Sequence, residues 1–267
     1  MTLRREVVLG GLLTILTASS DACCQPLLPA PRLRGCIIPD DLAARFFASS
    51  SDQQIFPTGD ELMPGGSGDR DFDFALAHTL VKIGAALDVL PGFAYYDDRS
   101  SPAAFATRET LLQRADGTKV DGTVLFGLRL LRHTRVELES PEVAVTAVCA
   151  HEFGHILQVK CGLYDRMSGL YGALVKGQVT KKRIELHADF LAGYFAGIRK
   201  REKPDFPAAI FPVKLGSMGD NDFNDPEHHG TPAERAAAAV QGFKVAYQER
   251  RGVLDAVRSG IQYVSSL

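Results

Sequence analysis

The chain has 267 residues, of which 45% are hydrophobic and 23% charged, and its 30 basic and 32 acidic side chains give a formal net charge of −2. This composition is that of an ordinary soluble globular protein. It offers no basic surface for nucleic acid, and no apolar run reaches the roughly 20 residues needed to span a bilayer. Disordered, collagen-like and multispan membrane classes are therefore excluded.

The first 22 residues have the layout of an export signal. Arg4 and Arg5 precede an apolar segment over residues 7–18, and a small-x-small arrangement ends at Ala22. This order is typical of a signal peptide, and the paired arginines resemble the twin-arginine export signal. We therefore expect a periplasmic or secreted protein. The alternatives, an uncleaved N-terminal anchor or a lipidated Cys23, are the two cases in which we expect membrane contact.

Cysteine pairing is left open by the sequence. An odd number of cysteines in an exported protein leaves at least one without a partner in its own chain. The last two cysteines lie twelve residues apart on one predicted helix, a separation of about 18 Å that is too long for a bridge. One of these two is expected to pair with Cys36 or to be a buried thiol. The five are Cys23, Cys24, Cys36, Cys149 and Cys161.

Two regions follow the signal segment. A Pro- and Gly-rich arm and linker is expected over residues 23–69, with a short helix over residues 40–48, and it ends in the breaker-rich stretch PTGDELMPGGSGD. A single folded domain is expected over residues 70–267, which agrees with a prior of about 150 residues per domain.

Hydrophobic spacing predicts the first elements of this domain. Apolar residues three and four apart predict an amphipathic helix over residues 71–90, followed by short strands over residues 93–96 and 103–107. Two Asp-Gly turn signals then predict a β-hairpin whose second strand covers residues 123–131. This strand is a candidate sheet edge along which an extended peptide could lie by strand addition.

Three long helices are predicted in the second half of the chain. Ser140 is the expected N-cap of the first helix, and Thr231 begins a capping box at the third. A stretch punctuated by Pro and Gly, residues 204–230, separates the second helix from the third. The three helices are expected over residues 141–161, 181–199 and 231–250.

The first of these helices contains the motif HEFGH, residues 151–155. Two imidazoles four residues apart lie one turn apart on one helix face, so His151 and His155 can reach one ion, with Glu152 offset toward its open side. Zinc favours nitrogen ligands and, with three protein ligands, keeps one position for water. Apolar neighbours predict that this helix is largely buried, where imidazoles and a carboxylate need partners.

The second helix contains ELHADFLAG, in which Glu185 and Asp189 are also four residues apart. Two acids at this spacing repel and weaken an isolated helix by roughly a few tenths of a kcal/mol, a conflict that a metal and a histidine would remove. Small residues around Gly193 would let this helix approach the first and present Glu185 as the third ligand. Asp189 could then accept the free N–H of a ligating imidazole. His187 is a competing candidate ligand, but it projects from nearly the opposite face.

HEFGH followed by ELHADFLAG resembles the gluzincin metallopeptidases, whose third ligand is the Glu of an ExxxD pair on the next helix. More specifically, AVCAHEFGHILQ, RIELHADFLAGYFAG and GDNDFNDPEHHGTPAERAAA resemble, in order and spacing, the bacterial neutral zinc metallopeptidase group over about residues 141–242. The resemblance implies a zincin-like α+β fold. In such a fold the HExxH helix packs under a small mixed or antiparallel sheet, accompanied by a second ligand-bearing helix and a C-terminal helix.

The third block of this resemblance concerns two neighbouring histidines. In that group the HGT element continues to an Arg, here Arg235, and the resemblance implies that its histidine donates to the oxyanion of the tetrahedral intermediate. The HGT match favours His229, although His228 stands where a small or hydroxyl residue is more familiar, so which of the two serves the site is open. The adjoining GDNDFND departs from the EF-hand pattern and predicts a solvated acidic loop rather than a calcium site.

The function implied is that of an exported zinc metallopeptidase whose catalytic domain is residues 70–267 and whose substrate is a peptide or protein. One Zn²⁺ would be held by His151, His155 and Glu185, with Glu152 as the general base for a zinc-activated water. The alternative is an exported, non-catalytic binding or assembly factor that retains a structural zinc site. A thiol enzyme using Cys149 is disfavoured, because no activating partner is evident.

Overall fold

The structure, a computed structural model, describes residues 54–55, 67–96, 98, 102–111, 117, 119–137, 140–163, 178–225 and 228–267. All of these belong to one unit, Leu33–Leu267. The predicted signal segment over residues 1–22, the predicted helix over residues 40–48 and most of the arm lie outside the described residues. So do Cys23, Cys24 and Cys36.

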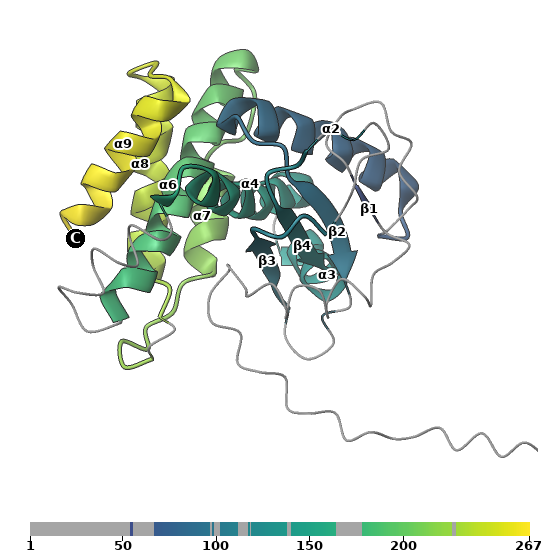
Figure 1. Ribbon diagram of the computed structural model, residues 1–267, viewed down its shortest axis with the longest axis horizontal. Coiled ribbons are helices and arrows are strands. Elements are labelled where there is room, and N and C mark those ends of the chain that lie inside the picture. The colour runs from purple at the N-terminus through teal and green to yellow at the C-terminus, as the bar shows by residue number, and fades with distance from the viewer. Residues whose placement is uncertain are drawn as a thin grey trace, which may run out of the picture. The chain divides into compact units, whose positions relative to one another are not determined.

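The described chain combines helices with one small sheet, as predicted for the α+β class (Figure 1). The predicted helices at residues 71–90, 141–161 and 181–199 and the strands at 93–96 and 103–107 are confirmed to within a few residues. The elements are β1 Gln54–Ile55, α2 Arg70–Leu87, β2 Gly92–Tyr96, β3 Ala104–Thr107, β4 Thr123–Gly127, α3 Leu128–Glu137, α4 Pro141–Lys160, α6 Gln178–Glu202, α7 Ile210–Ser217, α8 Pro232–Tyr247 and α9 Val253–Ser265.

Two helices begin where they were predicted to begin but differ in other details. Thr231 forms the predicted capping box with Glu234, but the helix it caps, α8, ends at Tyr247, and a separate helix, α9, follows it. Ser140 occupies the N-cap position of α4 without a side-chain capping bond. The Pro- and Gly-punctuated stretch over residues 204–230 contains the short helix α7. No helix within the described residues is both long and apolar enough to cross a membrane.

The sheet is mixed, with the strand order β1-β2-β4-β3. β2 and β4 pair in parallel, whereas β1 pairs with β2 and β3 with β4 in antiparallel fashion. β4 is therefore an internal strand, and the prediction that the strand beginning at Thr123 lies at a sheet edge is wrong. The parallel partner β2 is far away in sequence, so no local pattern reports this pairing.

The predicted strand over residues 123–131 is also too long, because the chain turns into α3 after Gly127. The reason lies about 30 residues upstream. The backbone N–H groups of Arg129 and Leu130 donate to the two carboxylate oxygens of Asp98, at 2.6 and 2.9 Å, so Asp98 caps the start of this helix. A Cβ on Gly127 would lie 2.1 Å from Asp98 Oδ2, which explains the glycine at this position.

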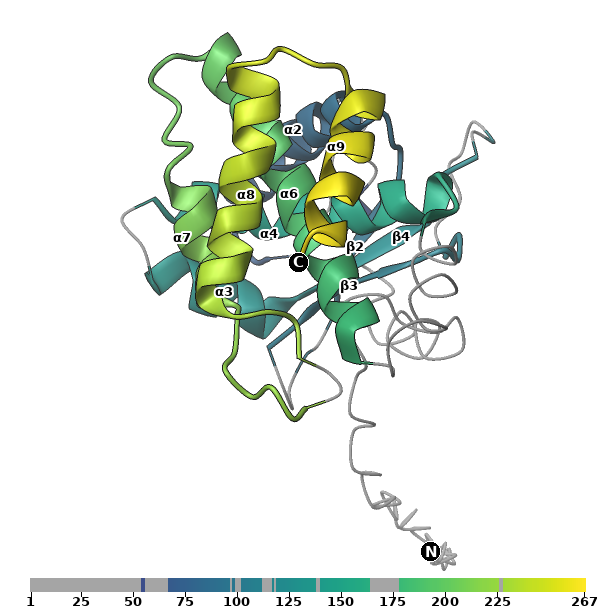
Figure 2. The same ribbon diagram turned by 90° about the vertical axis from the view of Figure 1, so that its left-hand side faces the viewer.

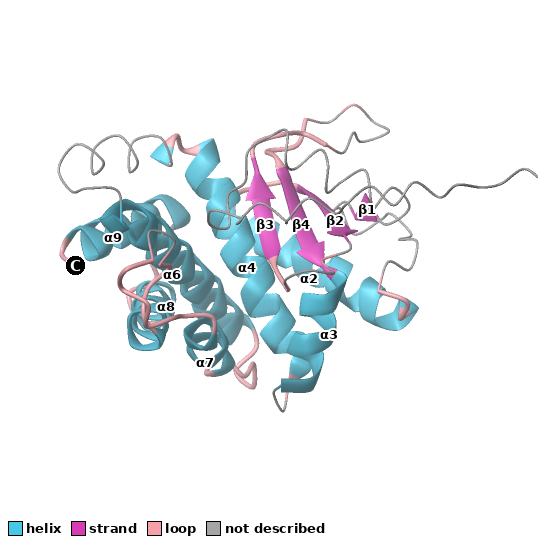
Figure 3. Cartoon of the chain, turned by 90° about the horizontal axis from the view of Figure 1, so that it is seen from below, coloured by secondary structure: helices cyan, strands magenta, loops and turns pink. Residues whose placement is uncertain are grey.

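α4 lies between the sheet and the C-terminal helices (Figures 1 and 3). It contacts α2, α3, β3 and β4 on one side and α6 and α7 on the other. Every residue from Ala144 to Gln158 is consequently buried, polar ones included. The HEFGH motif therefore lies in the interior of the protein, where each of its polar groups needs a partner.

Glycines set the spacing between α6 and its neighbours. A Cβ on Gly154 of α4 would lie 3.2 Å from the carbonyl oxygen of Ala188 on α6, so this pair of small residues allows the two helices to approach. Gly193, which was predicted to face α4, instead packs on α8, where its Cβ would lie 1.9 Å from the carbonyl oxygen of Ala239. α8 and α9 both lie against α6 (Figure 2).

The closest approach between α6 and α8 yields a stability prediction. A Cβ on Gly242 would lie 1.7 Å from the carbonyl oxygen of Phe190, so we expect Gly242→Ala to lower the free energy of unfolding by about 3 kcal/mol through overpacking. The measurement is urea denaturation followed by circular dichroism. Gly252→Ala is the control, because nothing lies within 4 Å of its added Cβ, and it should cost about 1 kcal/mol or less. Equal effects of the two variants would contradict the close packing.

Candidate metal site

Three side chains from two helices converge in the interior. His151 and His155 come from α4 and Glu185 from α6, and all three are buried. The Nε2 atoms of the two imidazoles lie 3.1 Å apart, and Glu185 Oε2 lies 3.2 Å from His151 Nε2 and 3.5 Å from His155 Nε2. Ligands about 2.1 Å from a tetrahedral ion are about 3.4 Å apart. The three predicted ligands are thus close enough to bind one metal ion.

The ion pair between Asp189 and Arg235 holds the His151 ring on the side away from the candidate ligand atoms. His151 Nδ1 donates to Asp189 Oδ1 at 2.8 Å, as predicted for Asp189. Arg235 of α8 donates two hydrogen bonds to the same carboxylate, from Nε at 2.8 Å and from Nη2 at 2.9 Å. Its Nη1 donates to the carbonyl oxygen of Met218 at 3.2 Å. This role of Arg235 was not predicted, because the two partners of the ion pair are 46 residues apart.

His155 is supported by different chemistry, which the sequence also did not indicate. Its Nδ1 lies 2.9 Å from Gln158 Oε1. Gln158 Nε2 lies 2.9 Å from the carbonyl oxygen of Ile184 and 3.0 Å from His187 Nδ1, and His187 Nε2 lies 3.2 Å from the carbonyl oxygen of Val257. His187 is thus not a member of the candidate ligand group but contacts it through Gln158. The position of Gln158, three residues after His155 on one helix face, is the signal that could have revealed the first contact.

The charges of the site are set by its neighbours. Burial acts to lower the pKa of His151, but Asp189 and Glu185 outweigh it and raise this pKa to about 9. Burial acts to raise the pKa values of the two acids. The histidines nevertheless hold the pKa of Glu185 well below its usual range, and Arg235 and His151 lower that of Asp189. Burial lowers the pKa of His187 to about 4. In the metal-free protein a proton on His151 therefore balances these carboxylates at neutral pH.

Glu152 differs from every other acid in the site. It is fully buried, and neither of its carboxylate oxygens has a hydrogen-bond partner among the described residues. Burial raises its pKa to about 7, although His151 and His155 act to lower it. A buried carboxylate without partners is costly, and its position beside the candidate ligand group suits a group that exchanges a proton.

The structure distinguishes the two neighbouring histidines. His228 Nδ1 is hydrogen-bonded to Asp220, a carboxylate that also accepts from the backbone N–H of His229. The side chain of His229 is within electrostatic range of Glu185 and His151, and burial lowers its pKa. The His229 side chain is thus close enough to Glu185 and His151 to interact with them electrostatically. Asp220 organises this loop, whose residues from Asn221 to Asn224 are exposed, as expected for a solvated acidic loop.

Cys149 carries a buried free thiol. Burial raises its pKa well above the usual range, and the nearby Glu152 adds to the effect. Because the thiolate is the nucleophilic form, this environment opposes a thiol-based reaction.

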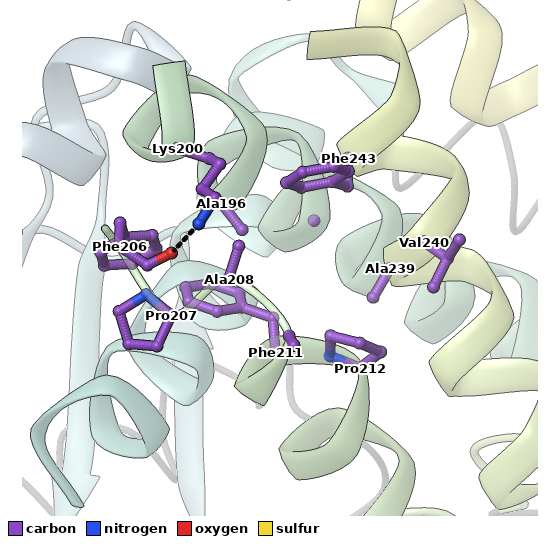
Figure 4. A pocket seen from close by; sticks show the side chains of 12 residues that line it. Ala196, Lys200, Phe206, Pro207, Ala208, Phe211, Pro212, Ala239, Val240 and Phe243 are labelled. Atoms are coloured by element: carbon purple, nitrogen blue, oxygen red, sulfur yellow. Dashed lines mark hydrogen bonds between the residues drawn. The ribbon is translucent and has the colours of Figure 1, made fainter. Parts of the chain in front are cut away.

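A cavity of about 400 Å³ lies elsewhere in the helical part, among α6, α7 and α8 (Figure 4). Its lining is mainly apolar, and the ammonium group of Lys200 at its wall donates to the carbonyl oxygen of Phe206 at 3.0 Å. None of the predicted site residues lines it. Other lining residues include Gly193, Ala196, Phe211 and Phe243.

Comparisons with known proteins add no assignment. No family model, curated protein or solved structure matches this chain.

The buried ion pair behind His151 yields a second stability prediction. We expect Arg235→Met to lower the free energy of unfolding of the metal-free protein by about 3–5 kcal/mol, because it leaves the Asp189 charge buried without its main partner. Denaturant titration measures this change. Arg258→Met is the matched control, since the Arg258–Asp255 pair is mostly exposed and should contribute at most about 1 kcal/mol. Similar losses in the two variants would contradict the ion-pair assignment.

The raised pKa of His151 predicts a pH dependence of metal binding. Below about pH 9 a metal ion must displace the proton on this imidazole, so the apparent Zn²⁺ affinity should rise by about tenfold per pH unit as pH approaches 9. Calorimetric titration at pH 7 in buffers of different ionisation enthalpy should detect release of that proton. At pH 10 this contribution should vanish. Equal proton release at both pH values would contradict the prediction.

Proposed function

We propose that this protein is a zinc-dependent metallopeptidase that hydrolyses peptide bonds. The observation that carries the proposal is the position of Glu152. This buried carboxylate, which has no hydrogen-bond partner among the described residues, directly follows one member of a three-residue group that could hold a metal ion. Two imidazoles, a carboxylate ligand and an adjacent free carboxylate are the set that metal-assisted hydrolysis requires.

The donor set favours zinc over other common ions. Two imidazole nitrogens and one carboxylate oxygen match the ligands of catalytic zinc, whereas calcium and magnesium prefer oxygen alone. Structural zinc sites are closed by four protein ligands. Within the described residues the group that could hold a metal has three members, which suits a catalytic site and disfavours a purely structural one.

Zn²⁺, when bound, supplies a Lewis acid that polarises the scissile carbonyl and lowers the pKa of water. Glu152 accepts the proton of the attacking water and delivers it to the leaving amine nitrogen. Burial raises the pKa of Glu152 to about 7 in the metal-free protein, and a group poised near neutral pH can both take up a proton and release it.

Two further side chains act in the proposed reaction. His229, within electrostatic range of Glu185, donates to the oxyanion of the tetrahedral intermediate. Asp189, held ionised by Arg235, fixes the orientation of the His151 ring.

The substrate is proposed to be a peptide or protein chain. Because β4 is internal, strand addition would use the edge strand β3, which contacts α4 and lies on the side of the sheet nearest the ligand helices (Figure 3).

The arrangement of the helices suits a zincin-like fold. In this arrangement α4 lies beside β3 and β4, α6 is the second ligand helix, and α8 and α9 follow it. We also propose export, on the sequence of residues 1–22.

Glu152→Gln tests the proposal. We expect this variant to bind one equivalent of zinc, because Glu152 is not a ligand, and to lose hydrolysis of casein by about 10²–10⁴-fold, because an amide cannot accept the proton. Zinc content and proteolysis are measured side by side. Glu142→Gln is the control, since Glu142 is an exposed acid at the start of the same helix and should leave both readouts unchanged.

Two outcomes would contradict the proposal in different ways. Undiminished hydrolysis by the Glu152→Gln variant would remove Glu152 from the reaction. A wild-type protein that holds zinc but turns over no substrate would favour the alternative, a binding or assembly factor with a structural zinc site.

A further inference from the structure

We infer that His187, acting through Gln158, is a positioning residue that sets the tautomer of His155 and thereby makes helix α9 part of the metal site. The inference rests on the proposed binding of zinc but not on the proposed hydrolysis. Its evidence is a chain of hydrogen bonds whose donors and acceptors can be assigned from two backbone carbonyl groups.

The first carbonyl group belongs to α9. The carbonyl oxygen of Val257 lies 3.2 Å from His187 Nε2, and a carbonyl only accepts, so Nε2 must carry a hydrogen. The other ring nitrogen, Nδ1, faces the amide nitrogen of Gln158 at 3.0 Å. An amide nitrogen only donates, so Nδ1 must offer its lone pair. His187 is therefore the neutral Nε2–H tautomer.

The second carbonyl group orients Gln158. The carbonyl oxygen of Ile184 lies 2.9 Å from Gln158 Nε2, so the two amide hydrogens of Gln158 serve Ile184 and His187. Its Oε1 then faces His155 Nδ1 at 2.9 Å and accepts a hydrogen from it. This leaves His155 Nε2, the atom that faces His151 and Glu185, with a free lone pair, as a metal ligand must have.

The reverse orientation of Gln158 would disable the ligand. With the amide flipped, Oε1 would face the carbonyl oxygen of Ile184, and the NH₂ group would face His155 Nδ1 and drive its hydrogen to Nε2. The two ends of an amide have nearly the same shape, so packing alone does not choose between them. His151 has no such ambiguity, because both oxygens of its partner Asp189 are acceptors.

α9 is held close enough to take part in this chain. His155, Gln158 and His187 are all fully buried. A Cβ on Gly260 of α9 would lie 2.6 Å from His187 Cδ2 and 2.8 Å from its Nε2. Only glycine therefore fits at this contact, and α9 packs directly on the imidazole that orients Gln158 together with the Ile184 carbonyl group.

Two substitutions of His187 separate positioning from packing. His187→Asn places an amide oxygen near the position of Nδ1 and keeps an acceptor for Gln158, whereas His187→Leu has similar bulk but no acceptor. Both lose the bond to Val257. We expect His187→Leu to weaken Zn²⁺ binding by about 10–100-fold and His187→Asn to stay within about threefold of the wild type, as measured by competition with a chromophoric chelator. Equal affinities for the two variants would overturn the inference.

A measurement on the wild-type chain covers the case in which a variant does not fold. Long-range ¹H–¹⁵N correlation spectra of the histidine rings report which nitrogen carries the hydrogen. The expected spectrum has His187 as the Nε2–H tautomer and His155 as the Nδ1–H tautomer. A hydrogen on His187 Nδ1 would overturn the inference.

The outcomes for the two proposals are separable. Zinc binding without peptide hydrolysis would end the proposed function and leave this inference standing. Normal hydrolysis by a protein whose His187 carries its hydrogen on Nδ1 would end this inference and leave the proposed function standing.

Discussion

The structure depends on bringing three electron-donating atoms together at a buried contact between α4 and α6. Two imidazole nitrogens and a carboxylate oxygen lie 3.1–3.5 Å apart at this contact. These atoms repel one another unless a positive charge lies between them, and burial makes the repulsion stronger than in water. A proton on His151 supplies that charge in the metal-free protein, and the surrounding helices keep the three atoms in place, so the site extends well beyond its three candidate ligands.

The two histidines are held in chemically different ways. His151 donates to Asp189, whose negative charge is balanced by Arg235 of α8. The support of His151 is therefore ionic, and it raises the basicity of the His151 ring. His155 donates to the neutral amide of Gln158, which His187 connects to α9. α8 and α9 thus take part in the site as well as in the core. Among the described residues, neither carboxylate oxygen of Glu152 has a hydrogen-bond partner, as suits a group that exchanges protons.

Local periodicity explains how much of this could be predicted from the sequence. Residues four apart on a helix share a face, so HEFGH and the Glu185–Asp189 pair indicated the ligand group and the support of His151. Prediction failed where the deciding partner is distant in the chain. Asp98 caps α3 from about 30 residues away and ends the strand at Gly127, and the parallel pairing of β2 with β4 makes β4 internal rather than an edge.

The sequence by itself determined which side chains could bind a metal and which helices carry them, because helical spacing depends only on neighbouring residues. The tertiary structure alone decided how those side chains are held. Arg235 meets Asp189 because α8 packs on α6 through glycines, and His187 meets Val257 because Gly260 lets α9 approach. Such contacts join residues tens of positions apart, and a buried polar group is satisfied by whichever partner the packed helices bring to it.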